Sequence, residues 1–274
     1  MLSNRECIRL YSIFKAISCS ALLFLIFSVD SAKSFPPIDF DEVPLSNSEF
    51  NSVANIEQTA RQVSVRIFPA GESGSGVIVA RQGNVYTVIT NAHVVGSEDQ
   101  YKVMTSDGTT HTARRLPNNN FNGLDLALIT FESSNSYWVA ELNLNPVVSG
   151  ERLYSAGFPG YHYPNEREIQ STENWGTEAF TLTAGQAGLY SHKPLLQGYQ
   201  LGYTNQVREG MSGGAVIDER GKLVGINGRL SYPVQGRSAF IYTDGTQVSP
   251  QLFQQIESLS WAIPVSAFQF VINN

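Results

Sequence analysis

Cysteine and histidine are scarce in this sequence. Its 274 residues include two cysteines, Cys7 and Cys19, and four histidines. No HExxH pattern occurs, and a site built on several thiolates would need more cysteines than the chain carries. We therefore expect no metal site, and we expect no disulfide in the part of the chain that follows Cys19.

Positive charge is also sparse. The chain has 18 lysine and arginine residues against 24 acidic residues, a formal net charge of -6, and no basic cluster. Nucleic acids bind to concentrated positive charge, so we exclude them as partners. The glycine-rich stretch at residues 71–76 lacks the lysine and the spacing of a phosphate loop, so we expect no nucleotide site.

Long apolar runs are missing except near the N-terminus. Three basic residues precede the apolar run 16–29, and the small residues Ser31, Ala32 and Ser34 follow it. The run is shorter than the roughly 20 residues of a comfortable membrane span, and the pattern is typical of a signal peptide. We predict a signal peptide over residues 1–34, export to the periplasm or the extracellular space, and no stable membrane span in the mature chain. An uncleaved anchor is the alternative.

Strand-forming residues follow a polar N-terminal segment. Residues 35–59 combine a proline-rich, acidic tether with a short helix that Ser46 and Glu49 would cap. Beyond them, short apolar or alternating runs are separated by turn residues, a pattern that favours an all-β fold. A looser stretch divides these runs into two units of similar size, residues 60–146 and residues 147–274, the second with helices near its end.

Local signals mark a turn and two helix starts. The sequence Arg-Gln-Gly-Asn at residues 81–84 indicates a hairpin turn. Ser249 followed by Pro250 indicates the start of a helix, and residues 265–274 favour a closing helix. His162 lies in a segment that we interpret as a loop.

Three short motifs carry the residues of a nucleophilic site. His93 lies just past an apolar run in TVITNAHVV, Asp125 begins another in LDLALITF, and Ser212 lies between glycines in GMSGGAVI. Acyl transfer by serine needs a hydroxyl, an imidazole that takes its proton, a carboxylate that orients the imidazole, and amide donors for the oxyanion. Each residue alone also fits a structural histidine, a solvated acid or an ordinary turn. Together they favour a site between the two units.

These motifs, with GSGVIVA upstream and GKLVGING downstream, resemble the chymotrypsin-like (trypsin-fold) serine proteases. The resemblance is to the bacterial branch of the HtrA/Deg protease domain and the glutamyl endopeptidases, and it spans residues 60–270. It implies an all-β fold of two antiparallel six-stranded β-barrels with a C-terminal helix. It also implies a serine endopeptidase that acts on protein or peptide substrates through an acyl-enzyme and uses no cofactor.

The resemblance also implies a role for each motif residue. Ser212 would be the nucleophile, His93 the general base and then the general acid, and Asp125 the carboxylate that orients the imidazole. The amides of Gly210 and Ser212 would form the oxyanion hole, where a permissive backbone lets amides turn toward the substrate.

Two positions depart from the family pattern. Met211 stands where trypsin-like zymogens have an aspartate that receives a freed N-terminus, so we expect no activation of that kind. Gly228 stands where many relatives have a hydroxyl residue that supports the catalytic aspartate. The carboxylate of Asp125 therefore needs other donors.

The primary substrate pocket falls, by the resemblance, on Gln206, Val207 and Asn227. Gln206 offers no carboxylate to a lysine or arginine of the substrate, and a buried unpaired cation there would be costly. Val207 and Asn227 differ from the threonine and histidine of glutamyl endopeptidases. We expect a neutral pocket that prefers uncharged, small to medium side chains, unless Arg208 or Arg229 points inward.

Two rival hypotheses remain open at this point. A catalytically silent double barrel would bind peptides or a partner without chemistry. An esterase of the α/β-hydrolase fold would also have a G-x-S-x-G pattern, which GMSGG matches. In that fold, however, the serine precedes a helix and the histidine comes last, whereas here a strand pattern follows and the histidine comes first.

The position of both cysteines gives the first prediction. If the segment that carries Cys7 and Cys19 is removed on export, no thiol is left in the protein, and reducing agents have nothing to act on. The melting temperature of the purified mature protein should be the same with and without dithiothreitol. A marked fall in dithiothreitol would show that the processing site lies elsewhere.

Overall fold

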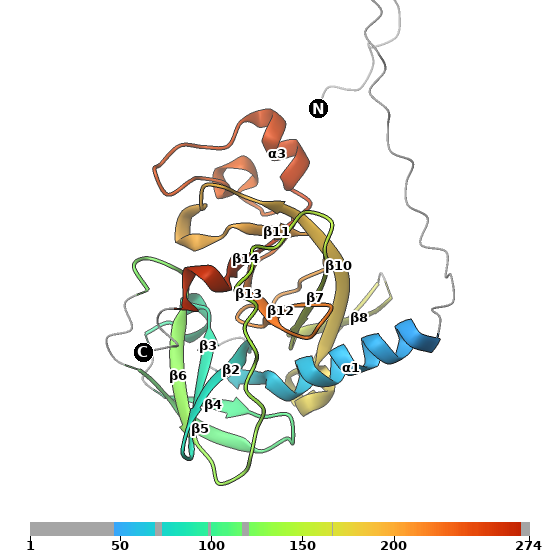
Figure 1. Ribbon diagram of the computed structural model, residues 1–274, viewed down its shortest axis with the longest axis vertical. Helices are drawn as coiled ribbons and strands as arrows, with labels where there is room; N and C mark the ends of the chain where they lie inside the picture. The colour runs from blue at the N-terminus through green and yellow to red at the C-terminus, as the bar shows by residue number, and fades with distance from the viewer. Residues whose placement is uncertain (1–46, 69–72, 98–99, 117–120, 166, 270–274) are drawn as a thin grey trace, which may run out of the picture. The chain divides into compact units, whose positions relative to one another are not determined.

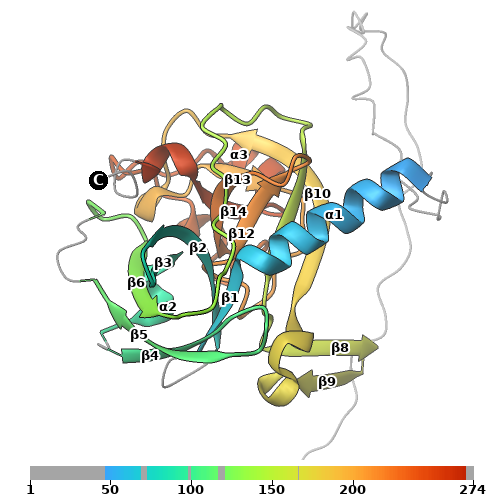
Figure 2. The same cartoon turned by 60° about the horizontal axis from the view of Figure 1, so that its bottom comes forward.

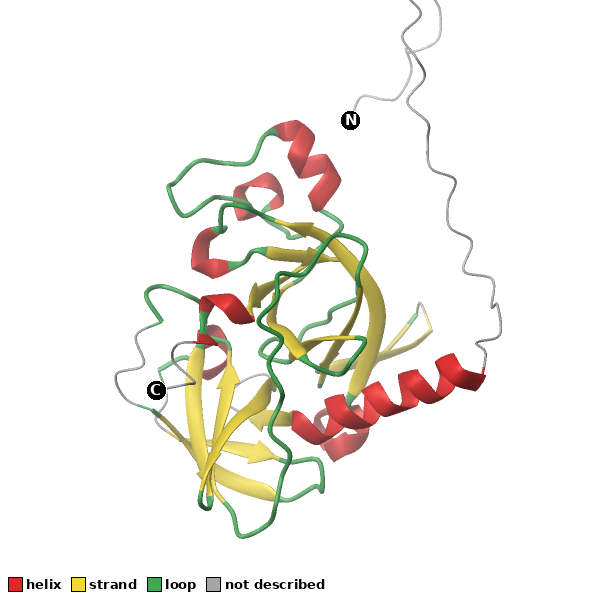
Figure 3. Cartoon of the chain, viewed as in Figure 1, coloured by secondary structure: helices red, strands yellow, loops and turns green. Residues whose placement is uncertain are grey.

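The strand-rich sequence builds two closed barrels (Figure 3). The computed structural model describes residues 47–68, 73–97, 100–116, 121–165 and 167–269. These residues lie in one compact unit that the contacts delimit as Leu45–Asn274. The predicted signal peptide and most of the predicted tether lie outside the described residues.

The first barrel consists of six antiparallel strands in the order β1-β2-β3-β6-β5-β4. Gln82 pairs with Val85 across the predicted hairpin turn, which is therefore confirmed. Side chains such as Val88 and Ile129 fill the interior and are fully buried. The strands are β1 (Ser64–Phe68), β2 (Gly74–Gln82), β3 (Val85–Thr90), β4 (Gln100–Met104), β5 (Thr110–Arg115) and β6 (Ala127–Glu132).

The second barrel also has six antiparallel strands, in the order β10-β11-β14-β13-β12-β7. Figure 1 shows it in yellow to red, next to the first barrel in cyan and green. The two closed barrels confirm the fold class expected from the sequence. The strands are β7 (Arg152–Gly157), β10 (Thr181–Tyr190), β11 (Leu201–Tyr203), β12 (Ala215–Asp218), β13 (Leu223–Arg229) and β14 (Ser260–Pro264).

A separate two-stranded hairpin follows β7. It pairs β8 (Tyr161–Asn165) with β9 (Glu168–Ser171), and Figure 2 shows it projecting beside the barrels. The interpretation of His162 as a loop residue is therefore wrong, because it lies in β8 with its ring 5.2 Å from that of Trp175. No side chain of this hairpin is buried, so its sequence lacks the apolar alternation that predicts a strand.

Short helices lie at the ends and corners of the barrels. The predicted start of α3 is confirmed, because the Ser249 side chain accepts a hydrogen bond of 3.1 Å from the amide of Leu252. No helix in the described ranges has the length and apolar character needed to cross a bilayer. The helices are α1 (Asn47–Val63), α2 (Ala92–Val95), α3 (Pro250–Ile256), and the 3-10 helices η1 (Glu173–Ala179), η2 (Leu196–Gly198), η3 (Gly236–Ala239) and η4 (Val265–Ala267).

Helix α1 is held by its apolar face. Ile56, Ala60 and Val63 are buried in a cluster that also contains residues of the second barrel. The helix therefore continues past residue 59, where the sequence pattern placed its end. At the other terminus, the predicted closing helix is represented by η4, and residues 270–274 lie outside the described part of the chain.

An apolar layer joins the two barrels. One buried cluster combines Val77 and Ile89 of the first barrel with Tyr154 and Ile226 of the second. Burial of apolar surface contributes about 25 cal/mol per Å2, so a shared layer of this kind fixes one barrel against the other. Loops at the edge of the layer are thereby held in fixed relative positions.

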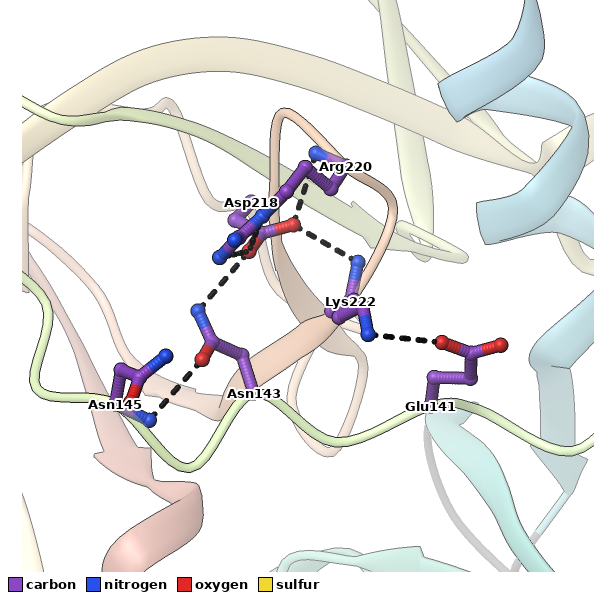
Figure 4. Close-up of polar contacts among 6 residues, drawn as sticks. All are labelled: Glu141, Asn143, Asn145, Asp218, Arg220 and Lys222. Carbon is purple, nitrogen blue, oxygen red and sulfur yellow. Dashed lines mark hydrogen bonds and ion pairs between the residues drawn. The ribbon is translucent and has the colours of Figure 1, made fainter.

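The segment that links the barrels is tied to the β12–β13 hairpin (Figure 4). The Asn143 side chain donates a hydrogen bond of 3.0 Å to the Asp218 carboxylate, and Lys222 forms an ion pair of 3.1 Å with Glu141. Backbone bonds reinforce the contact, since the amide of Leu223 donates to the carbonyl of Glu141. The nearly buried Asp218 is thus satisfied by neighbours, and this cluster is structural.

A buried arginine makes a second tie between the barrels. Arg66 on β1 is fully buried and donates to the carbonyls of Thr172 and Gly176, at 3.0 and 3.2 Å, and to the Thr172 hydroxyl. Burial lowers the pKa of Arg66, and the nearby negative charge of Glu173 opposes that effect. The segment between β9 and β10 is therefore anchored to the first barrel.

Candidate active site

His93 and Asp125 form a close pair. His93 lies in α2, directly after β3 ends, and Asp125 lies in the turn before β6. His93 Nδ1 is 2.6 Å from Asp125 Oδ2, and the His93 backbone amide donates to Asp125 Oδ1 at 3.0 Å. An ionised carboxylate requires the proton on Nδ1, which leaves Nε2 as an acceptor. The His93 side chain is 48% exposed, so this acceptor can face a substrate.

Asp125 is held by four residues besides its own neighbours in sequence. Its carbonyl accepts from the Asn91 side chain at 2.8 Å, and its amide donates to the carbonyl of Gln197 at 2.9 Å. The Tyr199 hydroxyl donates to Oδ2 at 2.5 Å. Burial alone would raise the pKa of Asp125, but the bonds from His93 and Tyr199 outweigh it, so the pKa is lowered. Asp125 is therefore an anion at neutral pH.

Ser212 lies on the second barrel, in the turn that leads into β12. Its carbonyl accepts a hydrogen bond of 2.9 Å from the amide of Ser75 on β2. The next residue, Gly213, has φ +82°, and a Cβ there would collide with Thr90 at the end of β3. The turn thus reaches the strand end that carries His93. Within the described residues no hydrogen bond joins the Ser212 hydroxyl to His93.

The two predicted oxyanion amides are free to bind. Among the described residues, neither the amide of Gly210 nor that of Ser212 donates to a protein acceptor. The carbonyl of Glu209 accepts a hydrogen bond of 2.9 Å from the amide of Gly160. Because a trans peptide points its C=O and N–H in opposite directions, this bond turns the Gly210 amide away from Gly160. Gly210 has φ +89°, which a residue with a side chain rarely adopts.

Ser75 fixes the same turn from the first barrel. Its hydroxyl donates to the carbonyl of Gly210 at 2.8 Å and accepts from the amide of Phe158 at 2.8 Å. Its backbone amide donates to the carbonyl of Ser212, and its side chain is fully buried. One residue of β2 therefore holds the backbone on both sides of Met211, which is itself fully buried.

The predicted pocket residues differ in their surroundings. Gln206 is exposed, and Val207 packs in an apolar cluster of the second barrel. Asn227 is fully buried, and its carbonyl oxygen Oδ1 accepts from the hydroxyls of Ser155, at 3.0 Å, and Tyr203. The polar groups of Asn227 are thus used inside the barrel.

A cavity of about 220 Å3 lies next to the turn that holds Gly210, because Glu209 lines it. Arg208 lines it, with its guanidinium over the Tyr163 ring, whereas Arg229 bonds a backbone carbonyl elsewhere. The cavity is lined by Tyr161, Tyr163, Arg208, Glu209 and Leu230.

Sequence reasoning missed Ser75 and Tyr199. Ser75 lies in the glycine-rich stretch at residues 71–76, which predicts no role for it, and Tyr199 lies in a segment without a motif. The one available signal was indirect, since the absence of a hydroxyl at Gly228 implied that another donor must hold Asp125.

Two buried serines provide a matched test of the Ser75 contacts. Ser75→Ala removes a donor and an acceptor that are both used, so the free energy of unfolding should fall by about 1–3 kcal/mol. Ser64→Ala is the control, because the fully buried Ser64 hydroxyl has no partner among the described residues, so its removal breaks no hydrogen bond and should not lower the free energy of unfolding. Chemical denaturation of both variants measures this. Equal losses would show that the Ser75 hydrogen bonds contribute nothing specific.

The sequence is similar to proteins that carry a protease name. The chain is 25% identical over 246 residues to a protein named serine protease HtrA-like from Staphylococcus aureus strain USA300, a match that covers 84% of this chain and 27% of the relative. The homologue from the bovine strain RF122 is 25% identical over 240 residues with the same coverage. The chain therefore spans about a quarter of the length of these relatives.

A solved structure shows the same fold. The crystal structure of the serine endoprotease from Yersinia pestis superposes with a TM-score of 0.56 and 23% identity, covering 85% of this chain and 67% of that one. The family model described as a trypsin-like peptidase domain matches residues 74–226, which is more than half of the chain and includes His93, Asp125 and Ser212. The protein therefore belongs to the trypsin-like peptidase domain family.

Proposed function

We propose that the protein is a serine endopeptidase that hydrolyses peptide bonds with Ser212, His93 and Asp125. The observation that carries this proposal is the 2.6 Å pair of His93 and Asp125. Gly213, which follows Ser212, packs against Thr90, three residues before His93. In the turn of Ser212, two backbone amides lack acceptors among the described residues. These contacts support a nucleophile, a base, an orienting carboxylate and oxyanion donors at one junction.

The proposed reaction begins with attack by Ser212. His93 Nε2 takes the hydroxyl proton while Ser212 Oγ bonds to the carbonyl carbon of the substrate, and the carbonyl π electrons move to its oxygen. The same proton passes to the leaving amine as the C–N bond breaks, which leaves an acyl-enzyme. Water then repeats the sequence, with His93 as its base, and releases the acid and free Ser212.

Asp125 and the oxyanion turn stabilise charge that develops during these steps. The lowered pKa of Asp125 keeps the carboxylate ionised next to the imidazolium that forms on His93. The amides of Gly210 and Ser212 would donate to the oxyanion, and no conformational change is needed to free them. Removing one such donor costs about 2.7–4 kcal/mol of transition-state stabilisation in other serine peptidases.

Met211 supports a site that needs no trypsin-type activation. It is fully buried in an apolar cluster of the second barrel, and it offers no carboxylate to an incoming ammonium group. Ser75 and Gly160 hold the turn instead. Removal of the predicted signal peptide over residues 1–34 is then the only processing that we expect, and the mature protein acts in the periplasm or outside the cell.

The alternative is a silent double barrel that binds peptides or a partner. Such a protein would have the same fold and the same contacts but would not hydrolyse the bound peptide. The two functions differ in turnover, because a binding protein releases its peptide intact.

Substitution of the nucleophile tests the proposed function. Ser212→Ala should lower kcat for peptide hydrolysis by about three orders of magnitude or more, because the triad acts as a unit. His93→Ala should have a similar effect. Ser134→Ala, at an exposed serine in the segment after β6, is the control and should keep full activity. Turnover by Ser212→Ala at a tenth of the wild-type rate, with an unchanged melting temperature, would contradict the mechanism.

A cleavage profile tests the pocket. We expect uncharged, small to medium side chains on the acyl side of the bond, with modest discrimination of about 1–3 kcal/mol per methylene. Values of kcat/KM across a peptide panel measure this. A preference of about a hundredfold for lysine or arginine would contradict the neutral pocket. A preference for glutamate would also contradict it and would implicate Arg208, which lines the cavity beside Gly210.

A further inference from the structure

The Tyr199 hydroxyl and the His93 ring converge on one carboxylate oxygen. Tyr199 donates to Asp125 Oδ2 at 2.5 Å, and His93 Nδ1 lies 2.6 Å from the same atom. Tyr199 is 2% exposed, so its hydroxyl has lost water as an alternative partner. A short bond from a buried hydroxyl to a carboxylate is charge-assisted and directional. It fixes the plane of the carboxylate against which the imidazole is aligned.

Gly228 leaves the space that Tyr199 fills. A Cβ at Gly228 would lie 2.7 Å from Tyr199 Cε1 and closer still to the hydroxyl, so a side chain at residue 228 and the Tyr199 ring exclude each other. In relatives with a hydroxyl residue at this position, the hydrogen-bond donor to the aspartate would come from the strand that corresponds to β13. Here the donor reaches the same carboxylate from the segment before β11.

The turn that carries Tyr199 is itself bound to Asp125. Gln197 and Gly198 have φ values of +68° and +89°, and the carbonyl of Gln197 accepts a hydrogen bond of 2.9 Å from the Asp125 amide. A left-handed conformation at glutamine costs free energy and persists only where its surroundings impose it. The amide of Leu195 donates to the carbonyl of Tyr199 and closes the turn. Backbone and side chain of one turn thus both hold the aspartate.

Arg229 supports the ring of Tyr199. Its guanidinium lies 4.6 Å from the ring centroid, and its Nη1 donates to the carbonyl of Ala239. Burial and the charge of Asp125 raise the pKa of Tyr199, so the hydroxyl keeps its proton and remains a donor. No other acceptor in the described residues competes for that proton.

We propose that Tyr199 is a positioning residue that orients Asp125 and, through it, His93, in place of the side chain that is absent at Gly228. This inference rests on the proposed peptidase function for its kinetic consequences. The geometry of the His93–Asp125 pair then depends on the turn of residues 195–199 in the second barrel.

The hydroxyl is tested by Tyr199→Phe with Tyr86→Phe as its control. Tyr86 is equally buried, and its hydroxyl bonds the backbone of residues 135 and 137 at the far end of β3. Tyr199→Phe should lower kcat by about tenfold with little change in KM, the effect of one lost bond to a charged group. Tyr86→Phe should change stability but not kcat. Equal kcat for Tyr199→Phe and the wild type, or equal losses in both variants, would overturn the proposal.

The pH dependence separates positioning from general loss of structure. With one donor fewer, the Asp125 carboxylate is less well stabilised, so the His93–Asp125 pair should take up a proton more readily and the acid limb of the kcat/KM profile should move to higher pH in Tyr199→Phe. Tyr86→Phe should leave the limb in place. If the acid limb of Tyr199→Phe lies at the same pH as that of the wild type, Tyr199 does not act by positioning Asp125.

A rescue experiment uses the exclusion between residues 199 and 228. Gly228→Ser alone should be damaging because of the clash with the Tyr199 ring. Tyr199→Leu should lose both the ring and the donor. Combining Tyr199→Leu with Gly228→Ser should recover part of kcat, because the serine hydroxyl can now reach the carboxylate. A double variant no more active than Tyr199→Leu would show that a donor to Asp125 is not what Tyr199 supplies.

A spectroscopic signature decides the point even if the protein hydrolyses no peptide. The proton on His93 Nδ1, hydrogen-bonded to Asp125, should give a downfield proton resonance that shifts in Tyr199→Phe and stays unchanged in Tyr86→Phe. An unshifted resonance in Tyr199→Phe would overturn the positioning role. Absence of turnover in the wild type with a shifted resonance would instead refute the peptidase function and leave the role of Tyr199 standing.

Discussion

The buried carboxylate of Asp125 constrains the rest of the structure. A carboxylate with only 5% of its residue exposed must be surrounded by donors, because an unpaired buried charge is costly. The donors come from both barrels, since His93 belongs to the first and Tyr199 to the second. Only an arrangement of the barrels that brings these donors together leaves the Asp125 carboxylate satisfied. The apolar layer between the barrels supplies much of the favourable free energy of their docking.

The contacts across the junction are reciprocal. Ser75 of the first barrel bonds the backbone of Gly210 and Ser212 in the second, and the turn of Tyr199 in the second barrel bonds Asp125 in the first. Each barrel thus completes the part of the site that the other carries. This arrangement explains how the turn of residues 210–212, with Met211 buried at its centre, is held without a buried ion pair among the described residues.

The sequence predicted the features that depend on neighbours along the chain. The hairpin at Gly83, the cap at Ser249 and the three motifs are continuous patterns, and so are the barrel strands with their apolar runs. Contacts between distant segments left no such pattern, which is why Ser75 and Tyr199 were not assigned roles. The β8–β9 hairpin was missed for a different reason, because a hairpin with no buried side chain needs no apolar alternation.

We propose that the junction activates Ser212 as a nucleophile through His93. Reaction of the protein with a fluorophosphonate, followed by peptide mapping, measures this without knowledge of the substrate. We expect a single adduct on Ser212 in the wild type and a labelling rate several orders of magnitude lower in His93→Ala. An adduct on a different serine, no adduct at all, or equal labelling rates in the two proteins would contradict it.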